Sequence, residues 1–256
     1  MITINPLSTT SLYTEIFYQD YILGTATSFV YKYKDEKYFI TNYHVAYGIN
    51  PENKVILNEN GMVPNKLIIH YYNQNLELKH ISINYQDDIN PFHFIKINDH
   101  IVDIAVFKLP NFDGFCINEP DIFKEFLKEE NNLYLGVTET LFVLGYPRGI
   151  NIQKTPIWKK SSIASEPEFD VNSLPYFYID TTTRDGMSGS PVIFYSQEGN
   201  YSLKNGGQVL ASGPTYCFVG VYSGRDRNDE PHIAQLGKVW RKSIIENIIK
   251  NTYNIP

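Results

Sequence analysis

Residues 181–191 read TTTRDGMSGSP and place Ser188 directly before Gly189 and two positions after Gly186. Glycine adopts positive φ angles, so it lets the backbone turn sharply and approach a ligand closely. Such a turn can hold the Ser188 hydroxyl outward while the amides of Gly186 and Ser188 point into one hollow, which is the arrangement of a nucleophile beside an oxyanion hole. Because Gly/Ser surface turns have a similar composition, two other segments must decide between these interpretations.

A histidine and an aspartate each stand where an apolar strand pattern begins or breaks. The strand-like run 38–41 continues into NYHVA, where His44 interrupts the alternation. Asp103 opens the apolar run 103–109, and a carboxylate there is costly to bury unless it is hydrogen-bonded. A structural histidine and a surface strand cap are the alternatives for each residue alone. Together with Ser188, the two supply the imidazole and the carboxylate that a catalytic triad needs.

The composition excludes several classes of function. The chain has 256 residues, a net charge of −6 and no basic block, so we expect no nucleic-acid partner. No apolar run approaches the roughly 18 residues that span a bilayer, and residues 1–12 lack the pattern of a secretory signal. Cys116 and Cys217 are too few for a disulfide framework, and no metal-ligand spacing is present. We therefore expect a cytoplasmic protein without a metal or membrane segment.

Tyrosine, phenylalanine and β-branched residues recur along the chain and favour strands. Turn residues separate the strand-like runs. Helical periodicity, by contrast, is confined to residues 121–130 and 240–250. The predicted strands are 12–18, 25–33, 38–41, 54–57, 66–72, 76–85, 92–97, 103–110, 140–144, 153–164, 176–180, 192–195, 215–223 and 232–239.

Three motifs in order resemble those of the chymotrypsin/trypsin-like serine proteases. Residues 41–45 (TNYHV) resemble their histidine motif, residues 103–109 (DIAVFKL) their aspartate strand, and residues 186–191 (GMSGSP) their nucleophile loop. Residues 144–149 (LGYPRG) are similar to the start of the second barrel in the high-temperature-requirement proteases, and residues 219–224 (VGVYSG) to the strand beside the specificity pocket. The resemblance spans roughly residues 12–250 and is nearest in style to disulfide-free bacterial trypsin-like peptidases.

The resemblance implies an all-β fold of two six-stranded antiparallel β-barrels with the active site in the cleft between them. His44 and Asp103 would lie on the first barrel and Ser188 on the second. The predicted parts are a first barrel over 12–118, a linker with a short helix over 119–132, a second barrel over 133–239 and a C-terminal helix over 240–251.

The same resemblance implies a mechanism. Ser188 would attack a scissile carbonyl, His44 would act as base and then as acid, and Asp103 would orient His44. The amides of Gly186 and Ser188 would stabilise the oxyanion. No metal or cofactor is needed.

Substrate binding is implied for the strand near residue 223 and for the loop before the nucleophile. The backbone of residues 223–225 would pair with an extended substrate as an added strand, and Ser223 is expected to hydrogen-bond Asp103. The substrate-binding residues expected from the resemblance are Thr182, Thr183, Tyr222, Ser223, Gly224 and Arg225.

Side-chain specificity stays open at this point. Trypsin-type enzymes place an acid where this chain has Thr182, so a preference for Lys or Arg is not supported. Thr183 matches a threonine of glutamyl endopeptidases, but Tyr222 replaces their partnering histidine. Arg184 and Arg225 would favour acidic substrates, whereas solvated loop charges are the plainer interpretation. A preference for Glu or Asp and a preference for small apolar residues both remain.

Met187 departs from the pattern of many secreted relatives, which have an aspartate directly before the nucleophile. There the aspartate pairs with a new N-terminal amine after proteolytic maturation. A thioether cannot form that ion pair. We therefore expect no activation by N-terminal cleavage, and either a constitutively formed site or gating by a regulatory protein partner.

These features favour a serine endopeptidase acting on a protein or peptide substrate. Two alternatives stay open at the level of sequence. The fold could serve as a peptide-binding or scaffold module whose triad is idle until a partner orders it, or the same triad could act as an esterase-type acyl hydrolase.

Overall fold

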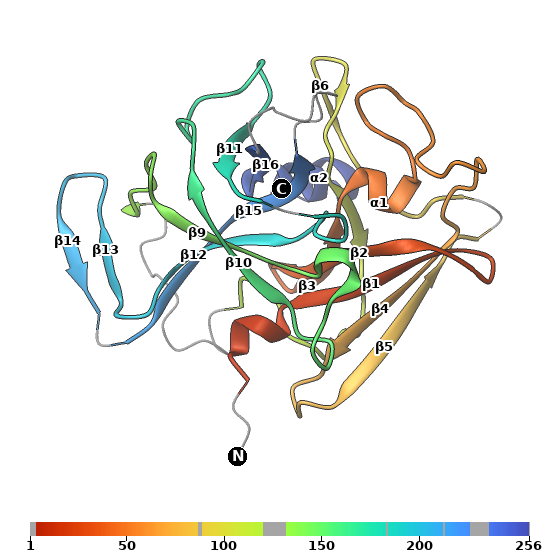
Figure 1. Ribbon diagram of the computed structural model, residues 1–256, viewed down its shortest axis with the longest axis horizontal. Coiled ribbons are helices and arrows are strands. Elements are labelled where there is room, and N and C mark those ends of the chain that lie inside the picture. The colour runs from red at the N-terminus through yellow and green to blue at the C-terminus, as the bar shows by residue number, and fades with distance from the viewer. Residues whose placement is uncertain are drawn as a thin grey trace.

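Alternation of buried and exposed residues produces strands along most of the chain, as residues 66–72 illustrate, where every second side chain is buried. The computed structural model describes residues 4–86, 89–119, 132–182, 184–211, 213–225 and 236–255. Figure 1 shows two groups of strands, one red to yellow and one green to blue, meeting in the middle of the molecule. The all-β class expected from the sequence is confirmed.

The first half is a six-stranded antiparallel sheet in the order β5-β4-β1-β2-β3-β8. A small hairpin, β6 (Lys96–Ile97) with β7 (His100–Ile101), precedes its last strand. The six strands are β1 (Ser11–Tyr18), β2 (Tyr21–Tyr33), β3 (Glu36–Thr41), β4 (Lys66–Tyr72), β5 (Leu78–Asn84) and β8 (Ala105–Lys108).

This first sheet is not the closed barrel that the sequence predicts, since β5 and β8 do not pair within the described residues. The free side of β8 is met by His93 instead, which exchanges two 2.8 Å backbone hydrogen bonds with Val106. Pro91, just before this bridge, has no N–H with which to extend a ladder. The predicted strand 92–97 is therefore reduced to one bridge and β6, and the sheet stays a half-barrel.

The second half is a closed six-stranded barrel in the order β10-β11-β16-β15-β12-β9, which confirms the prediction for this half. Closure leaves no unpaired sheet edge over most of its length. The hairpin of β13 (Asn200–Ser202) and β14 (Gln208–Leu210) extends from it. The barrel strands are β9 (Thr140–Gly145), β10 (Ile157–Ile163), β11 (Tyr176–Asp180), β12 (Pro191–Ser196), β15 (Thr215–Arg225) and β16 (Leu236–Arg241).

Two short 3₁₀ turns, η1 (Pro6–Thr9) and η3 (Pro147–Gly149), accompany the strands. The C-terminal helix α2 (Ser243–Tyr253) buries the isoleucines at 244, 245, 248 and 249. The predicted linker helix at 121–130 lies outside the described residues. None of the helices in the described ranges is both long and apolar enough to cross a membrane.

Two local predictions are wrong. The segment around His44 is not the end of a strand but the helix α1 (Tyr43–Tyr47), which ends at Gly48 with φ +67°. Residues 54–57 are irregular, with a single bridge between Ile49 and Ile56, and do not form a strand. Both differences concern the loop that borders the site described next.

One hydrophobic cluster joins the two halves. Phe29 of β2 and Phe218 of β15 pack with ring centroids 5.3 Å apart, and the isoleucines of α2 belong to the same cluster. Separate clusters fill the interior of each half. Because the first cluster holds the halves together, the loops between them are fixed relative to one another.

Candidate active site

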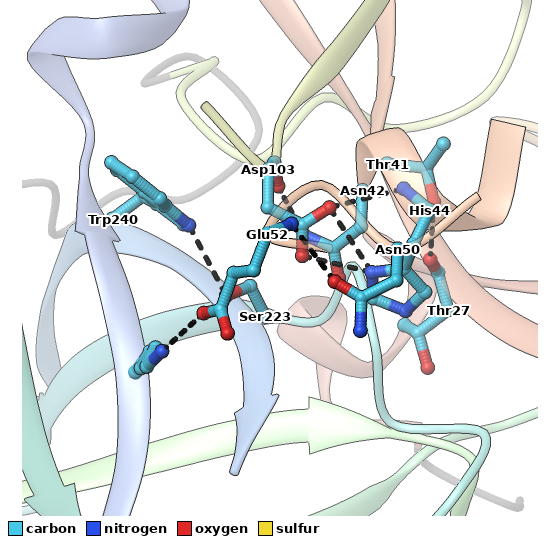
Figure 2. A network of polar contacts seen from close by, with 10 residues as sticks. Thr27, Thr41, Asn42, His44, Asn50, Glu52, Asp103, Ser223 and Trp240 are labelled. Atoms are coloured by element: carbon cyan, nitrogen blue, oxygen red, sulfur yellow. Dashed lines mark hydrogen bonds and ion pairs between the residues drawn. The ribbon is translucent and has the colours of Figure 1, made fainter. Parts of the chain in front are cut away.

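His44 and Asp103 are in direct contact. The strand β3 ends at Thr41, and α1 then directs the His44 side chain toward the loop before β8. His44 Nδ1 lies 2.8 Å from Asp103 Oδ2 and 3.0 Å from Oδ1. The His44 backbone N–H also donates to Asp103 Oδ1 at 3.0 Å. Figure 2 shows these contacts converging on the carboxylate.

The fold supplies hydrogen-bond donors to the Asp103 carboxylate, whose burial the sequence analysis identified as energetically costly. Asp103 is only 5% exposed, and its two oxygens accept from both the ring and the backbone of His44. Asn42 fixes the aspartate backbone by donating from Nδ2 to Asp103 O at 2.7 Å. Burial, with the charge of Asp103 second, raises the pKa of the neighbouring Tyr43. A proton held on His44 Nδ1 by the carboxylate leaves Nε2 as an acceptor.

Ser188 lines the same cavity as His44 and Asp103, a space of about 170 Å³ between the two halves. It lies in the loop between β11 and β12 and is partly exposed. Within the described residues, no hydrogen bond joins Ser188 to His44. The structure therefore brings the three residues to one cavity, with direct contact between two of them.

The nucleophile loop needs glycine at two positions. Gly186 has φ +91° and Gly189 has φ +82°, values that side-chain-bearing residues rarely adopt. A Cβ at Gly186 would collide with Tyr146 O, and one at Gly189 would collide with Thr27 O. The loop is thus pressed against the backbone of both halves, which explains the glycines that the sequence places around Ser188.

Backbone hydrogen bonds orient the peptide planes of this loop. Asp185 O accepts from the amide of Arg148 at 2.6 Å, and in a trans peptide the following N–H, that of Gly186, points the opposite way. Among the described residues, the amides of Gly186 and Ser188 donate to no protein acceptor. In this part of the chain neither N–H is therefore committed to another protein group; of the two residues, Ser188 lines the cavity and Gly186 is buried.

Thr27 of β2 hydrogen-bonds to the carbonyl groups of residues 186 and 188 in this loop. Its amide donates to Ser188 O at 2.9 Å and its hydroxyl donates to Gly186 O at 2.8 Å. The same hydroxyl accepts from the Tyr146 amide at 3.2 Å. Thr27 is fully buried, so a first-half residue fixes the shape of a second-half loop.

Met187, which departs from the aspartate of many secreted relatives, is 1% exposed and packs in the interior of the second barrel. Hydrogen bonds from Thr27 and from the Arg148 amide hold the loop, although Met187 makes no ion pair.

The residues expected to bind substrate are only partly brought together. Tyr222, Ser223 and Gly224 line the cavity. Thr182 is exposed and does not line it. Thr183 lies outside the described residues. The backbone of Arg225 belongs to β15 and pairs with Gly237, while its side chain is outside the described part.

Ser223 does not make the expected hydrogen bond with Asp103 in the described structure. Its Oγ accepts from Trp240 Nε1 at 3.1 Å instead. The His44 backbone amide takes the place of a serine hydroxyl as a second donor to the carboxylate.

One edge of β15 is open beside the nucleophile loop. The ladder with β12 ends at the pair Pro191–Val221, and Tyr222 then exchanges hydrogen bonds of 2.9 and 3.0 Å with the backbone at residues 189–190. Beyond it, Ser223 and Gly224 have β16 on one side and no strand of the described chain on the other.

Sequence reasoning missed the residues that support the site from a distance. Glu52 of the loop after α1 and Lys238 of β16 both line the cavity and pair with each other at 2.6 Å, although 186 positions separate them. Thr27 and Trp240 also lie outside the motifs. No local pattern marks such contacts; the break in alternation at NYHVA was the one available sign that the chain leaves the sheet there.

The chain matches known proteins at the level of family and fold. A family model described as a trypsin-like peptidase domain matches residues 26–200, more than half of the chain. None of the curated proteins compared with the chain matches its sequence.

Solved structures share the fold at low identity. The Rv3671c protein of M. tuberculosis H37Rv, a serine-to-alanine mutant in an inactive form, is similar with a TM-score of 0.51 and 15% identity, over 98% of this chain and 90% of that one. The catalytically inactive tobacco etch virus protease complexed with substrate has a TM-score of 0.51 and 12% identity over 97% and 86% of the two chains. The MamO protease domain of Magnetospirillum magneticum, in its apo form, has a TM-score of 0.50 and 12% identity over 94% and 96%.

Proposed function

The chain belongs to the family of trypsin-like peptidase domains, and from this premise we propose that it is a serine endopeptidase that cleaves peptide bonds through an acyl-enzyme on Ser188. The observation that carries the proposal is the contact of His44 Nδ1 with the buried Asp103 carboxylate at 2.8 Å, beside a cavity that Ser188 also lines. A protein or peptide is the substrate in this proposal, and no cofactor takes part.

The proposed reaction uses these groups in sequence. His44 Nε2 takes the proton from the Ser188 hydroxyl as the oxygen attacks the scissile carbonyl, and it later returns a proton to the leaving amine. Asp103 keeps the imidazole oriented and stabilises its charged form. Water then attacks the acyl-enzyme with His44 again as base.

The amides of Gly186 and Ser188 are the proposed oxyanion hole. Donors of this kind contribute about 2.7–4 kcal/mol each to transition-state stabilisation. Neither amide donates to a protein acceptor among the described residues, which supports the assignment. The substrate backbone would add to the open edge of β15 at residues 223–225, which gives affinity with little dependence on sequence.

A peptide-binding module with an idle triad is the second candidate. The observation in its favour is that no hydrogen bond joins Ser188 to His44 in the described structure. Catalytic hydrogen bonds are often long in unliganded enzymes and tighten when substrate binds, so we favour the peptidase. A partner protein that orders the triad would belong to the second candidate.

Labelling with a fluorophosphonate probe tests the proposal. Wild-type protein should form a covalent adduct and Ser188→Ala should not, while Ser243→Ala, which removes an exposed hydroxyl at the start of α2, should react like wild type. Ser188→Ala should lower peptide turnover by about six orders of magnitude. Cleavage of esters without cleavage of amides would reassign the site to an acyl hydrolase, and absence of any labelling would favour the module.

The two cysteines, Cys116 and Cys217, are both free and buried. They are consistent with a reducing compartment, and we keep the cytoplasm as the proposed location.

A further inference from the structure

A loop from the first half crosses the cavity and reaches the second barrel. After α1, residues 48–57 fold back on themselves, with hydrogen bonds from Asn50 N to Val55 O at 2.9 Å and from Leu57 N to Gly48 O at 2.8 Å. At the tip of this loop, Glu52 Oε1 lies 2.6 Å from Lys238 Nζ on β16. Figure 2 shows the Glu52 side chain in the same network view as His44, Asp103 and Ser223.

The two partners of this ion pair are held very differently. The Lys238 side chain is 13% exposed, whereas that of Glu52 is 71% exposed. Lys238 is anchored in a strand, and its ammonium lies 5.6 Å from the centre of the Tyr176 ring. A largely buried ammonium needs a negative partner, but an exposed carboxylate on a loop returns to water at little cost. The cation is therefore a fixed part of the cavity, and the Glu52 carboxylate is a replaceable one among its contacts.

Lys238 lies within reach of the proposed substrate path. It stands between the pairs Tyr222–Val239 and Arg225–Gly237 in the ladder of β15 with β16, opposite the bulge at residues 223–224. A substrate strand on the open edge of β15 would lie two strand spacings, about 10 Å, from β16. An extended lysine and a substrate glutamate or aspartate can span that distance together.

Part of the cavity wall is apolar and aromatic. Ile101 from β7, Leu174, Tyr176 and Trp240 line it. Low-polarity walls strengthen an ion pair relative to one in open water. An acidic side chain entering beside Lys238 would therefore meet its fixed ammonium in a site that excludes part of the solvent, although Arg184, Asp185 and Asp103 also line the cavity.

We propose that Lys238 is a specificity-determining residue that binds an acidic side chain of the peptide substrate on the amino side of the scissile bond. In the protein without substrate, the Glu52 carboxylate occupies the position of that acidic side chain. The inference deepens the proposed peptidase function and rests on it for the direction of the substrate. It assigns the substrate class as peptides with Asp or Glu a few residues before the cleaved bond.

The test separates binding from turnover. A phage-displayed random heptapeptide library is selected on the full chain carrying Ser188→Ala, and again on Ser188→Ala combined with Lys238→Glu. The first selection should enrich Asp or Glu at one fixed position, and the second should enrich Lys or Arg at that position. Synthetic peptides with Glu or Gln at this position should differ in affinity by about fivefold for the Lys238 protein, the effect of a pair worth about 1 kcal/mol.

Two further variants separate a role of Lys238 in substrate specificity from a role in attaching the loop 48–57 to β16. Glu52→Gln in the Ser188→Ala background should bind acidic peptides more tightly, because the Glu52 carboxylate no longer competes for Lys238. The exchange Glu52→Lys with Lys238→Glu preserves an ion pair across the cavity, so it should keep the melting temperature while selecting basic peptides. Enrichment that ignores the charge at position 238, or no charge enrichment at any position, would overturn the inference. Fluorophosphonate labelling of the chain with native Ser188 decides the peptidase proposal independently of this result.

Discussion

At the scale of single residues, the cost of burying Asp103 explains both the stability and the proposed chemistry of the site. The carboxylate is 5% exposed and accepts from His44 N and Nδ1 at 2.8–3.0 Å. An amide in its place would present N–H groups to one of these donors. The imidazole would then lose the partner that fixes its tautomer.

We therefore expect Asp103→Asn to fold and to lose about four orders of magnitude in kcat, the size of this change in the chymotrypsin-family template. Peptide turnover and the rate of fluorophosphonate labelling measure the effect. Urea unfolding of the variant serves as the control for folding. A decrease in kcat of less than tenfold in a folded variant would show that Asp103 does not act through His44.

Cys116 supports a prediction about reactivity. It is fully buried, and burial, followed by the charge of Glu119, raises the pKa of its thiol to about 12. At pH 8 a thiol with that pKa is almost entirely protonated, and only the thiolate is reactive. A Cys217→Ala variant, which keeps Cys116 as the single thiol, should be nearly inert to a disulfide reagent until urea unfolds it. Absorbance of the released thiolate measures this; native labelling at the rate of a small free thiol would contradict it.

Predictions for single residues from the sequence are strongest where only one residue type suits the backbone conformation. The serine loop and its glycines could be identified because positive φ and close backbone approach leave few alternatives to glycine. The partner of Ser223 could not be identified, since its hydroxyl accepts from Trp240, which the sequence prediction places in the C-terminal helix and the structure places in β16. Glu52 and Lys238 meet only because two halves fold together.

At the scale of elements, the nucleophile loop takes its shape from β2. Thr27 donates to Gly186 O and Ser188 O and accepts from Tyr146 N. These bonds hold the peptide planes that carry the proposed oxyanion donors. Thr27 touches no reacting atom in this account and is a positioning residue.

Thr27→Val keeps the shape of the side chain and leaves the Gly186 carbonyl and the Tyr146 amide without this partner. Unsatisfied buried groups cost about 1–3 kcal/mol each in stability. Because the hole acts mainly in the transition state, kcat should fall by about tenfold or more with KM nearly unchanged. Thr27→Ser keeps the hydroxyl and should recover most of kcat. Lower stability of Thr27→Val without a lower kcat would assign Thr27 a purely structural role.

Strand patterns predict elements well where the alternation is long and poorly where it is short. The boundaries of β4 and β11 agree with the sequence prediction, since both are runs rich in aromatic and β-branched residues with turn residues close by. Residues 54–57 are apolar enough for a strand, but no neighbouring strand is available to pair with them. Closure of the first sheet fails for the same kind of reason, because His93 occupies the edge of β8 that β5 would need. Pairing partners are a tertiary property that local sequence does not encode.

At the scale of the whole molecule, the C-terminal helix ties the end of the chain to the first sheet. Tyr253 of α2 accepts from Lys108 N of β8 at 3.2 Å, and Tyr31 of β2 donates to Glu246 of α2 at 3.0 Å. The isoleucines of α2 belong to a cluster with residues of both halves. Although α2 follows the second barrel in sequence, it is part of the packing of the first sheet.

This shared core predicts that the two halves unfold together and that Ile248→Ala weakens both. Truncation of a buried isoleucine costs about 2–5 kcal/mol, and Ile248 is fully buried in the shared cluster. Tryptophan fluorescence reports the second barrel, since Trp158 lies in β10 and Trp240 in β16. Hydrogen exchange of the β3 and β8 amides, followed by mass spectrometry, reports the first sheet.

The urea midpoints from the two probes should coincide in wild type and shift down together in Ile248→Ala, because a cluster that spans both halves couples their stability. Asn247→Ala, an exposed change on the same helix, should leave the free energy of unfolding from both probes within about 0.5 kcal/mol of wild type. Separate midpoints, or a shift confined to one probe, would mean that the halves are independent units. The cavity that His44, Asp103 and Ser188 line would then lie at a mobile boundary between two bodies, and a gating partner would become the better account of how the triad is assembled.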